Sequence, residues 1–236
     1  MTVRRRALDG WLVVGGAVGT GLCAVAAAAA LTDQGDRTLF LHINALPDAL
    51  YRPLWIVQLI GVLGAPIAVA ALAVGTRRFR LAAGLVLLVP TKLVVERDVL
   101  KQLVHRPRPG AMVPEAILRD VPTAGSAFPS GHAMIVFAMV VLLSPYVNRR
   151  AQLALAAAAL LAAVARIYLG AHTPLDVLGG AAAGITLGAL LNLAVGVGPA
   201  ASGPRDDGPP HPSRSPLPGR GRRWESTDSP TKDERR

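Results

Sequence analysis

Six long apolar stretches set the limits on how this chain can fold. Each is close to the length, about 20 residues, that an α-helix needs to cross a bilayer. The chain is 52% hydrophobic but only 4% aromatic, and its abundant Ala, Leu, Val and Gly suit closely packed membrane helices better than a soluble core. We therefore expect an all-α fold, a bundle of six transmembrane helices at residues 11–31, 54–74, 81–100, 130–147, 153–169 and 175–197.

Clusters of basic residues orient this bundle. They lie before the first stretch, between the second and third, and between the fourth and fifth: Arg4 to Arg6; Arg77, Arg78 and Arg80; and Arg149 with Arg150. Lys and Arg are enriched in cytoplasmic loops. The pattern predicts a multi-pass protein of the cell membrane with both termini in the cytoplasm, and the alternate loops at 32–53, 101–129 and 170–174 on the outer side.

The net charge of +10 also raises the question of a nucleic-acid partner. The basic residues come in short clusters between apolar runs, not along one amphipathic face, so we expect membrane lipids and no nucleic acid as partners. Cys23 is the single cysteine. It excludes both a disulfide framework and a zinc site built from cysteines.

The two ends of the chain carry separate predictions. The run from Trp11 to Leu31, with small residues near Ala26 to Ala30, resembles a secretory signal, but it exceeds the roughly 7–15 apolar residues of a signal peptide, so we favour an uncleaved first helix. From Gly198 the chain is rich in Pro, Gly, Ser, Arg and Asp, which cannot bury enough surface to fold. We expect a membrane domain at 1–198 and a disordered cytoplasmic tail at 199–236.

Charged residues interrupt the third apolar stretch at Lys92, Glu96, Arg97 and Asp98. Charges inside a membrane are costly and often functional. Two interpretations stay open. The charges pair with neighbours near the outer interface while Lys101 snorkels outward, or they support a functional site.

Three clusters of polar residues fall at the outer ends of the predicted helices. Phosphoryl transfer spreads negative charge over the non-bridging oxygens, and catalysis consists mainly of positioning and stabilising that charge. Lysine and arginine can do so without a metal ion, and arginine matches two phosphate oxygens at once. The clusters are Lys101 with Arg108 and Pro109, then Pro129 to His132, and then Arg166, His172 and Asp176.

The second cluster has the composition of a helix start. Proline suits the first turn, and Gly131 lets a ligand approach the backbone. The free N–H groups of such a turn, the helix dipole and the Ser130 hydroxyl could bind a phosphate group. An ordinary helix cap is the alternative interpretation.

Two histidines have neighbours suited to covalent catalysis. Asp176 stands four positions after His172, where its carboxylate can accept the Nδ1 proton, present Nε2 as the nucleophile and stabilise the positive ring. His132 would then act as general acid and later as general base. Alternatively, Thr173 caps the helix and Asp176 complements its dipole; both interpretations can hold together. The remaining histidines, His42, His105 and His211, are expected to be loop residues.

Together these residues resemble the signature of the type 2 phosphatidic acid phosphatase (PAP2) family. Lys101 and Arg108-Pro109 match its first block, Pro129 to His132 its second, and Arg166, His172 and Asp176 its third. The resemblance covers about residues 54–197. One position departs, because Ala165 stands where the family has serine. Arg106-Pro107 repeats the Arg-Pro pair, so Arg106 could be a second phosphate contact.

The resemblance implies a helical fold of the PAP2 and haloperoxidase-like type and a metal-independent lipid phosphatase without a cofactor. Catalysis would use a phosphohistidine on His172, with Lys101, Arg108, Ser130, Gly131 and Arg166 binding phosphate. The predicted substrate is a lipid phosphate or diphosphate of the polyprenyl, phosphatidate or phosphatidylglycerophosphate type; the sequence gives no signal for oligomeric state. The six predicted spans argue against a soluble haloperoxidase. A lipid phosphotransferase of the same family and a non-catalytic anion or lipid carrier are the alternatives.

Overall fold

The computed structural model describes residues 3–30, 33–122 and 124–197. The predicted tail at 199–236 lies outside the described residues. Within these ranges all regular secondary structure is helical and no strand occurs, so the predicted all-α class is confirmed for this part of the chain.

The helices follow one another along the chain, with a long connection only at 113–130 among the described residues. The α-helices are α1 (Val3–Ala28), α2 (Asp33–Asn44), α3 (Tyr51–Gln58), α4 (Gly64–Gly75), α5 (Phe79–Leu93), α6 (Lys101–Leu103), α7 (Pro109–Met112), α8 (Gly131–Leu143), α9 (Arg149–Tyr168) and α10 (Pro174–Val195). Short 3₁₀ turns lie at Asp48–Leu50, Leu59–Gly61 and Ser144–Tyr146, and a π-helical segment, Val94–Leu100, continues α5.

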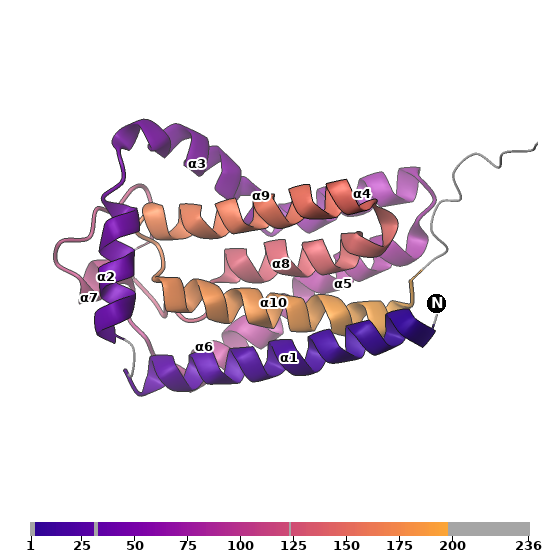
Figure 1. Ribbon diagram of the computed structural model, residues 1–236, viewed down its shortest axis with the longest axis horizontal. Helices are drawn as coiled ribbons and strands as arrows, with labels where there is room; N and C mark the ends of the chain where they lie inside the picture. The colour runs from indigo at the N-terminus through magenta and orange to yellow at the C-terminus, as the bar shows by residue number, and fades with distance from the viewer. Residues whose placement is uncertain (1–2, 31–32, 123, 198–236) are drawn as a thin grey trace, which may run out of the picture. The chain divides into compact units, whose positions relative to one another are not determined.

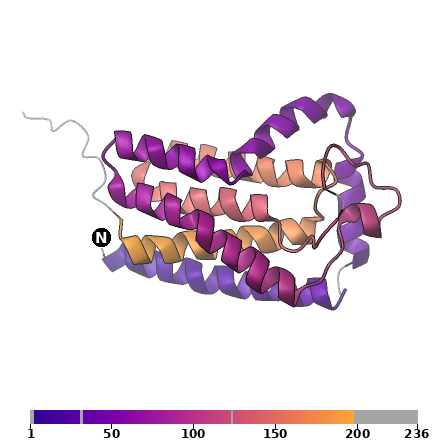
Figure 2. The ribbon, with the colours of Figure 1, turned by 180° about the vertical axis from the view of Figure 1, so that it is seen from behind.

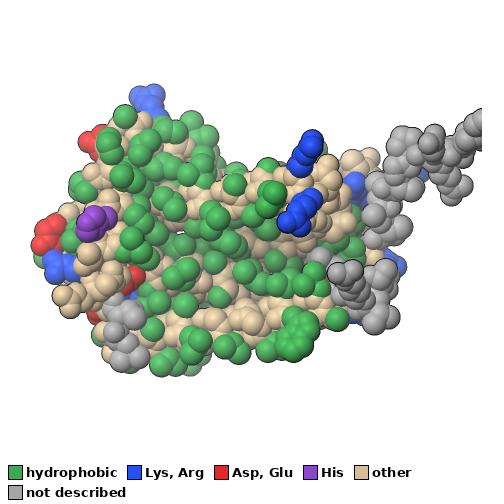
Figure 3. Space-filling view, in the orientation of Figure 1, with side chains coloured by type: hydrophobic (Ala, Val, Ile, Leu, Met, Phe, Trp, Pro, Cys, Tyr) green, Lys and Arg blue, Asp and Glu red, His purple; other side chains and the backbone are tan. Residues whose placement is uncertain are grey.

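Not all six predicted spans meet the requirements for crossing a membrane. Within the described residues, three helices are long and apolar enough, namely Arg6–Ala28, Arg149–Tyr168 and Pro174–Val195. A fourth span results if the pair Asp48–Gly61 and Gly64–Gly75, bent by 63°, counts as one. The helix at Gly131–Tyr146 is shorter, and buried charges interrupt the helix that contains α5. The six-span prediction is therefore only partly supported, although apolar side chains cover much of the face in Figure 3, with charged ones toward its two ends.

Helix α10 lies between α1 on one side and α8 on the other (Figure 1). Gly180, Gly184 and Gly188 repeat every four residues along α10 and face the backbone of α8. A Cβ atom on Gly188 would lie 2.7 Å from the carbonyl oxygen of Ala138. Small residues let membrane helices approach this closely, so this stripe sets the alignment of α8 on α10.

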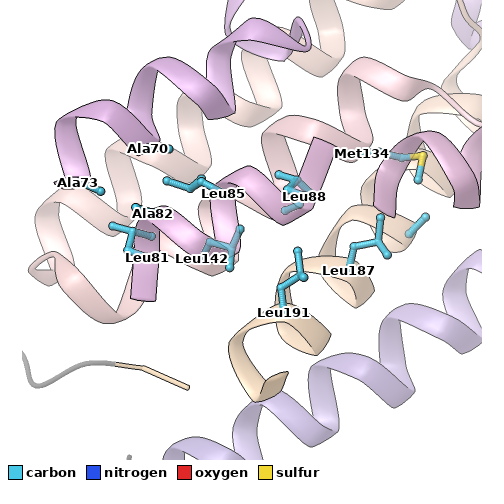
Figure 4. Close-up of a cluster of buried hydrophobic side chains, with 12 residues drawn as sticks. Ala70, Ala73, Leu81, Ala82, Leu85, Leu88, Met134, Leu142, Leu187 and Leu191 are labelled. Carbon is cyan, nitrogen blue, oxygen red and sulfur yellow. The ribbon is translucent and has the colours of Figure 1, made fainter. Parts of the chain in front are cut away.

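The largest core cluster joins α4, α5, α8 and α10 (Figure 4). Leu85 and Leu88 of α5 are fully buried there, and they pack with Met134 of α8 and Leu187 of α10. In lipid, such association depends on van der Waals packing, because the tails are as apolar as leucine. The cluster holds α5 beside α8 and α10, the helices that begin close to His132 and His172.

Helix α2 crosses one end of the bundle, in contact with α9 and α10 (Figure 1). Its buried Asp36 accepts a hydrogen bond from the backbone N–H of Leu175 at 2.8 Å. Asn44 exchanges hydrogen bonds with the backbone of Ile117 and donates to the carbonyl of Tyr168. Arg119 donates to the carbonyls of Asn44 and Tyr168. These contacts fasten the segment after α7 to the end of α9.

Candidate active site

All three polar clusters lie at the end of the bundle that α2 covers (Figures 1 and 2). The first turns of α8 and α10 are joined directly, because the N–H of Ser130 donates to the carbonyl oxygen of Asp176 at 2.9 Å. Ser130 has extended backbone angles and is fully buried, and its hydroxyl oxygen accepts from the N–H of Ala133 at 3.5 Å. The helix cap therefore forms, while the hydroxyl hydrogen stays available to donate to an anion.

His172 and Asp176 lie side by side where α10 begins. The His172 Nδ1 atom is 3.8 Å from Asp176 Oδ2, and both side chains are buried. This gap is longer than a hydrogen bond, and the same carboxylate oxygen accepts the N–H of Thr173 at 2.9 Å. Among the described residues, Nδ1 has no hydrogen-bond partner. Both interpretations of Asp176 thus retain support, since it caps the helix and also faces the imidazole.

His132 is the second residue of α8 and packs against the break between α3 and α4. A Cβ atom on Gly61 would lie 2.9 Å from the His132 Cβ and 3.0 Å from its Cδ2. Only a residue without a side chain fits there. His132 is half-buried and lies within electrostatic reach of His172 and Arg166. The two histidines therefore lie near each other, close to the starts of α8 and α10.

Two arginines flank the nucleophile candidate. Arg108 is half-buried and donates to the carbonyls of Ala124 at 2.9 Å and Ala171 at 3.1 Å. Arg166, at the end of α9, is buried and donates to the side-chain oxygen of Gln58. Burial and these two cations lower the pKa of His172, although Asp176 opposes the shift. The imidazole is therefore held neutral, as a nucleophile requires.

Lys101 is part of a cluster of three charges. Its Nζ atom lies 2.6 Å from Glu96 Oε1, and Lys92 pairs with the other carboxylate oxygen. A Cβ atom on Gly131 would lie 2.7 Å from both Glu96 Oε1 and Lys92 Nζ. Arg97 and Asp98 are exposed. Of the four charged residues in the third apolar stretch, only Lys92 and Glu96 therefore lie against Gly131 at the start of α8.

Several other predicted or ambiguous residues lie elsewhere. Arg106 is buried and paired with Asp33 at 3.1 Å and Asp36 at 2.7 Å, so its guanidinium is engaged in docking α2. His42 and His105 are exposed, and His211 lies outside the described residues. In the described ranges, no group of three or more His, Cys, Asp or Glu side chains is arranged to hold a metal ion.

Sequence reasoning missed Gln58 and Gly61, which come from the bent pair α3 and α4. A polar residue inside an apolar stretch is expensive in a membrane and marks a functional position. That signal could have singled out Gln58. No comparable signal marked Gly61, because glycine is frequent throughout this chain.

Comparison with known proteins places the chain in a family. The sequence pattern of the PAP2 superfamily matches residues 77–197, more than half of the chain. The crystal structure of LpxE from Aquifex aeolicus is 26% identical, with a TM-score of 0.60 over 65% of this chain and 92% of that chain. A transmembrane PAP2 type phosphatidylglycerolphosphate phosphatase from Bacillus subtilis shares the fold, at 21% identity and a TM-score of 0.66 over 78% of this chain and 96% of that chain. The curated proteins searched gave no significant match.

The fold and the matched motifs define the class: this is a helical membrane enzyme of the phosphatase type. The chain belongs to the PAP2 superfamily, which confirms the predicted family.

Proposed function

We propose that this protein hydrolyses a lipid phosphate or diphosphate at the non-cytoplasmic face of the cell membrane, through a phosphohistidine on His172. One solved relative supports a lipid-phosphate substrate, because it is a transmembrane phosphatidylglycerolphosphate phosphatase. The polyprenyl, phosphatidate and phosphatidylglycerophosphate types remain the substrate class. A site at the end of a membrane bundle leaves the lipid chain in the bilayer while the head group reacts.

The observation that carries the proposal is the Ser130 to Asp176 hydrogen bond, 2.9 Å between backbone nitrogen and oxygen. It joins the first turn of α8, with His132, to the first turn of α10, which follows His172. A helix start supplies N–H donors and a favourable dipole for an anion. Arg108 and Arg166 lie within electrostatic reach of His172, which supports a pocket for a phosphate group.

The reaction then proceeds in two displacements. His172 Nε2 attacks phosphorus, the bond from phosphorus to the lipid oxygen breaks, and His132 gives that oxygen a proton. Water next attacks the phosphohistidine, His132 takes a proton from the water, and inorganic phosphate leaves with His172 restored. Asp176 stabilises the positive ring, while Lys101, Arg108 and Arg166 stabilise the phosphoryl oxygens.

We also propose six spans with both termini in the cytoplasm. Arg77 and Arg78 precede α5, and Arg149 and Arg150 begin α9, so these arginines lie at the bundle end opposite the histidines. The positive-inside rule favours a cytoplasmic position for that end. In this arrangement α5 and α8 cross the lipid, and the charged residues at their ends stay at the membrane interfaces.

A hydrolysis assay tests this function. Purified protein in detergent, with a chelator present, is incubated with a panel of lipid phosphates and diphosphates, and released inorganic phosphate is measured. We expect release from at least one lipid, and a loss of about a thousandfold or more in His172→Gln, as for other lost nucleophiles. His105→Gln is the matched control, because this histidine is exposed. Chelator-sensitive turnover would refute the metal-independent mechanism.

The same assay separates the alternatives. Added acceptor alcohols or lipids would divert the phosphoryl group in a phosphotransferase, and a phosphorylated acceptor would replace inorganic phosphate as the product. A carrier would give no phosphate release, and its transport would survive His172→Gln.

A further inference from the structure

A buried cluster of three charges lies beside the site: Lys92, Glu96 and Lys101. The Glu96 side chain is 7% exposed, and its two carboxylate oxygens each contact a different lysine. Lys92 is 8% exposed at the side chain, and Lys101 is 23% exposed. Lys101 is therefore the member of the cluster most open to a ligand.

The π-helical segment Val94–Leu100 explains how this cluster forms. In an α-helix, residues five apart point about 140° away from each other. A π turn carries hydrogen bonds from i to i+5, so residues five apart share a face. Glu96 and Lys101 are five apart, while Lys92 precedes Glu96 by four. The wider turn brings both lysines to one carboxylate.

The cluster also touches the second motif. Glu96 Oε1 and Lys92 Nζ would each lie 2.7 Å from a Cβ atom on Gly131. Gly131 begins α8, and the next residue, His132, lies within electrostatic reach of Lys92 and Glu96. The absence of a side chain at Gly131 therefore makes room for the carboxylate next to the proposed phosphate pocket.

Stability alone gives no reason for two buried charges and a half-buried one here. Desolvating charges is expensive, and apolar side chains of similar size would hold the helices together at least as well. The arrangement has a different effect. Lys92 neutralises Glu96 and anchors one of its oxygens, while the other oxygen fixes the flexible Lys101 side chain and leaves the cluster with one net positive charge.

We propose that Glu96 is a positioning residue that holds the Lys101 ammonium group at the phosphate pocket, with Lys92 anchoring Glu96. This inference rests on the proposed function, because it assumes that Lys101 binds the substrate phosphate. Glu96 itself does not touch substrate. It acts through Lys101 by restricting a long side chain before the phosphate group arrives, which reduces the ordering needed for binding.

A double-mutant cycle tests the inference. Binding of orthovanadate, a phosphate analogue, is measured by calorimetry on the purified full-length protein, and lipid phosphate hydrolysis is measured in parallel. Glu96→Gln keeps the size of the side chain and removes its charge. We expect it to weaken vanadate binding and to lower kcat/KM by about tenfold, the effect of about 1.4 kcal/mol. In a Lys101→Met background the same change should cost less than twofold, because its target is gone.

Asp98→Asn is the matched control. It removes the same charge from the same π-helical segment at an exposed position, so we expect vanadate binding within twofold of the wild type. Equal or tighter vanadate binding by Glu96→Gln would overturn the inference, since Glu96 would then compete with phosphate for Lys101. A full tenfold effect in the Lys101→Met background would also overturn it. A wild-type protein that binds vanadate and hydrolyses no lipid phosphate would instead refute the proposed function.

Discussion

Arg166 donates a hydrogen bond from its guanidinium group to the side-chain oxygen of Gln58, 108 positions earlier in the chain. Both residues are buried. Gln58 ends α3, directly before the 3₁₀ turn that separates α3 from α4. The bent pair of helices therefore supplies the hydrogen-bond partner of Arg166.

Replacing Gln58 by Leu should impair the enzyme without unfolding it. Leucine has a similar size but cannot accept the guanidinium hydrogen bond, which leaves a buried arginine without its partner. We expect kcat/KM for a lipid phosphate to fall by about tenfold or more, given about 1.5–3 kcal/mol for a hydrogen bond to a charged group. Gln34→Leu, at an exposed position of α2, should stay within twofold. Equal activities of the two variants would contradict this role for Gln58.

Gly61→Ala should displace His132. The new Cβ atom would lie 2.9 Å from the His132 Cβ and 3.1 Å from its backbone oxygen, so the helix start itself has to move. A misplacement of about 1 Å at a catalytic group can lower the rate about a hundredfold, and we expect kcat to fall by about tenfold to a hundredfold. Gly64→Ala is the control, because nothing lies within 4 Å of its Cβ position. Unchanged kcat in Gly61→Ala would show that His132 tolerates the shift.

Local signals in the sequence predicted where α8 and α10 begin. Pro129 with Ser130, and Thr173 with Pro174, are helix-start patterns, and the helices begin at Gly131 and Pro174. The charge pattern predicted one common end for both starts. The Ser130 to Asp176 hydrogen bond could not be predicted from the sequence, because it depends on how closely the α10 glycines let α8 approach.

Contacts between distant helices were not predictable in the same way. Gln58 and Gly61, which reach Arg166 and His132, lie where the helix pair α3 and α4 bends by 63°, and no local pattern specifies a bend of that size. The pairing of Glu96 with Lys101 depends on a π turn, which has no sequence signature in an apolar helix. Hydropathy alone also predicted membrane spans at α5 and α8, which are not among the described helices that are long and apolar enough to cross a membrane.

The pH dependence of hydrolysis should report the buried environment of His172. Burial and the nearby arginines lower its pKa below the usual value for histidine, about 6.5. The nucleophile works when neutral, so on the acid side activity falls as the pH drops through the lowered pKa of His172. We expect the acidic limb of a kcat/KM profile to lie below pH 6.5, the ordinary pKa of histidine. In Asp176→Asn the carboxylate that favours the charged ring is lost, so this limb should move to still lower pH while kcat falls. A limb at or above pH 6.5 would contradict a buried, neutral nucleophile.

Asp36 and Asp33 of α2 both pair with Arg106, but they should differ in their contribution to stability. The Asp36 side chain is 4% exposed, contacts Arg106 at 2.7 Å and accepts the N–H of Leu175, whereas the Asp33 side chain is 53% exposed and contacts Arg106 at 3.1 Å. Asp36→Ala leaves the buried Arg106 with only the exposed Asp33 as its partner and leaves the N–H of Leu175 without an acceptor, which should lower the free energy of unfolding by about 3 kcal/mol. Asp33→Ala should cost less than about 1 kcal/mol, as is usual for exposed ion pairs. Thermal unfolding in detergent measures the difference, and similar melting temperatures for the two variants would show that α2 is not held through Asp36.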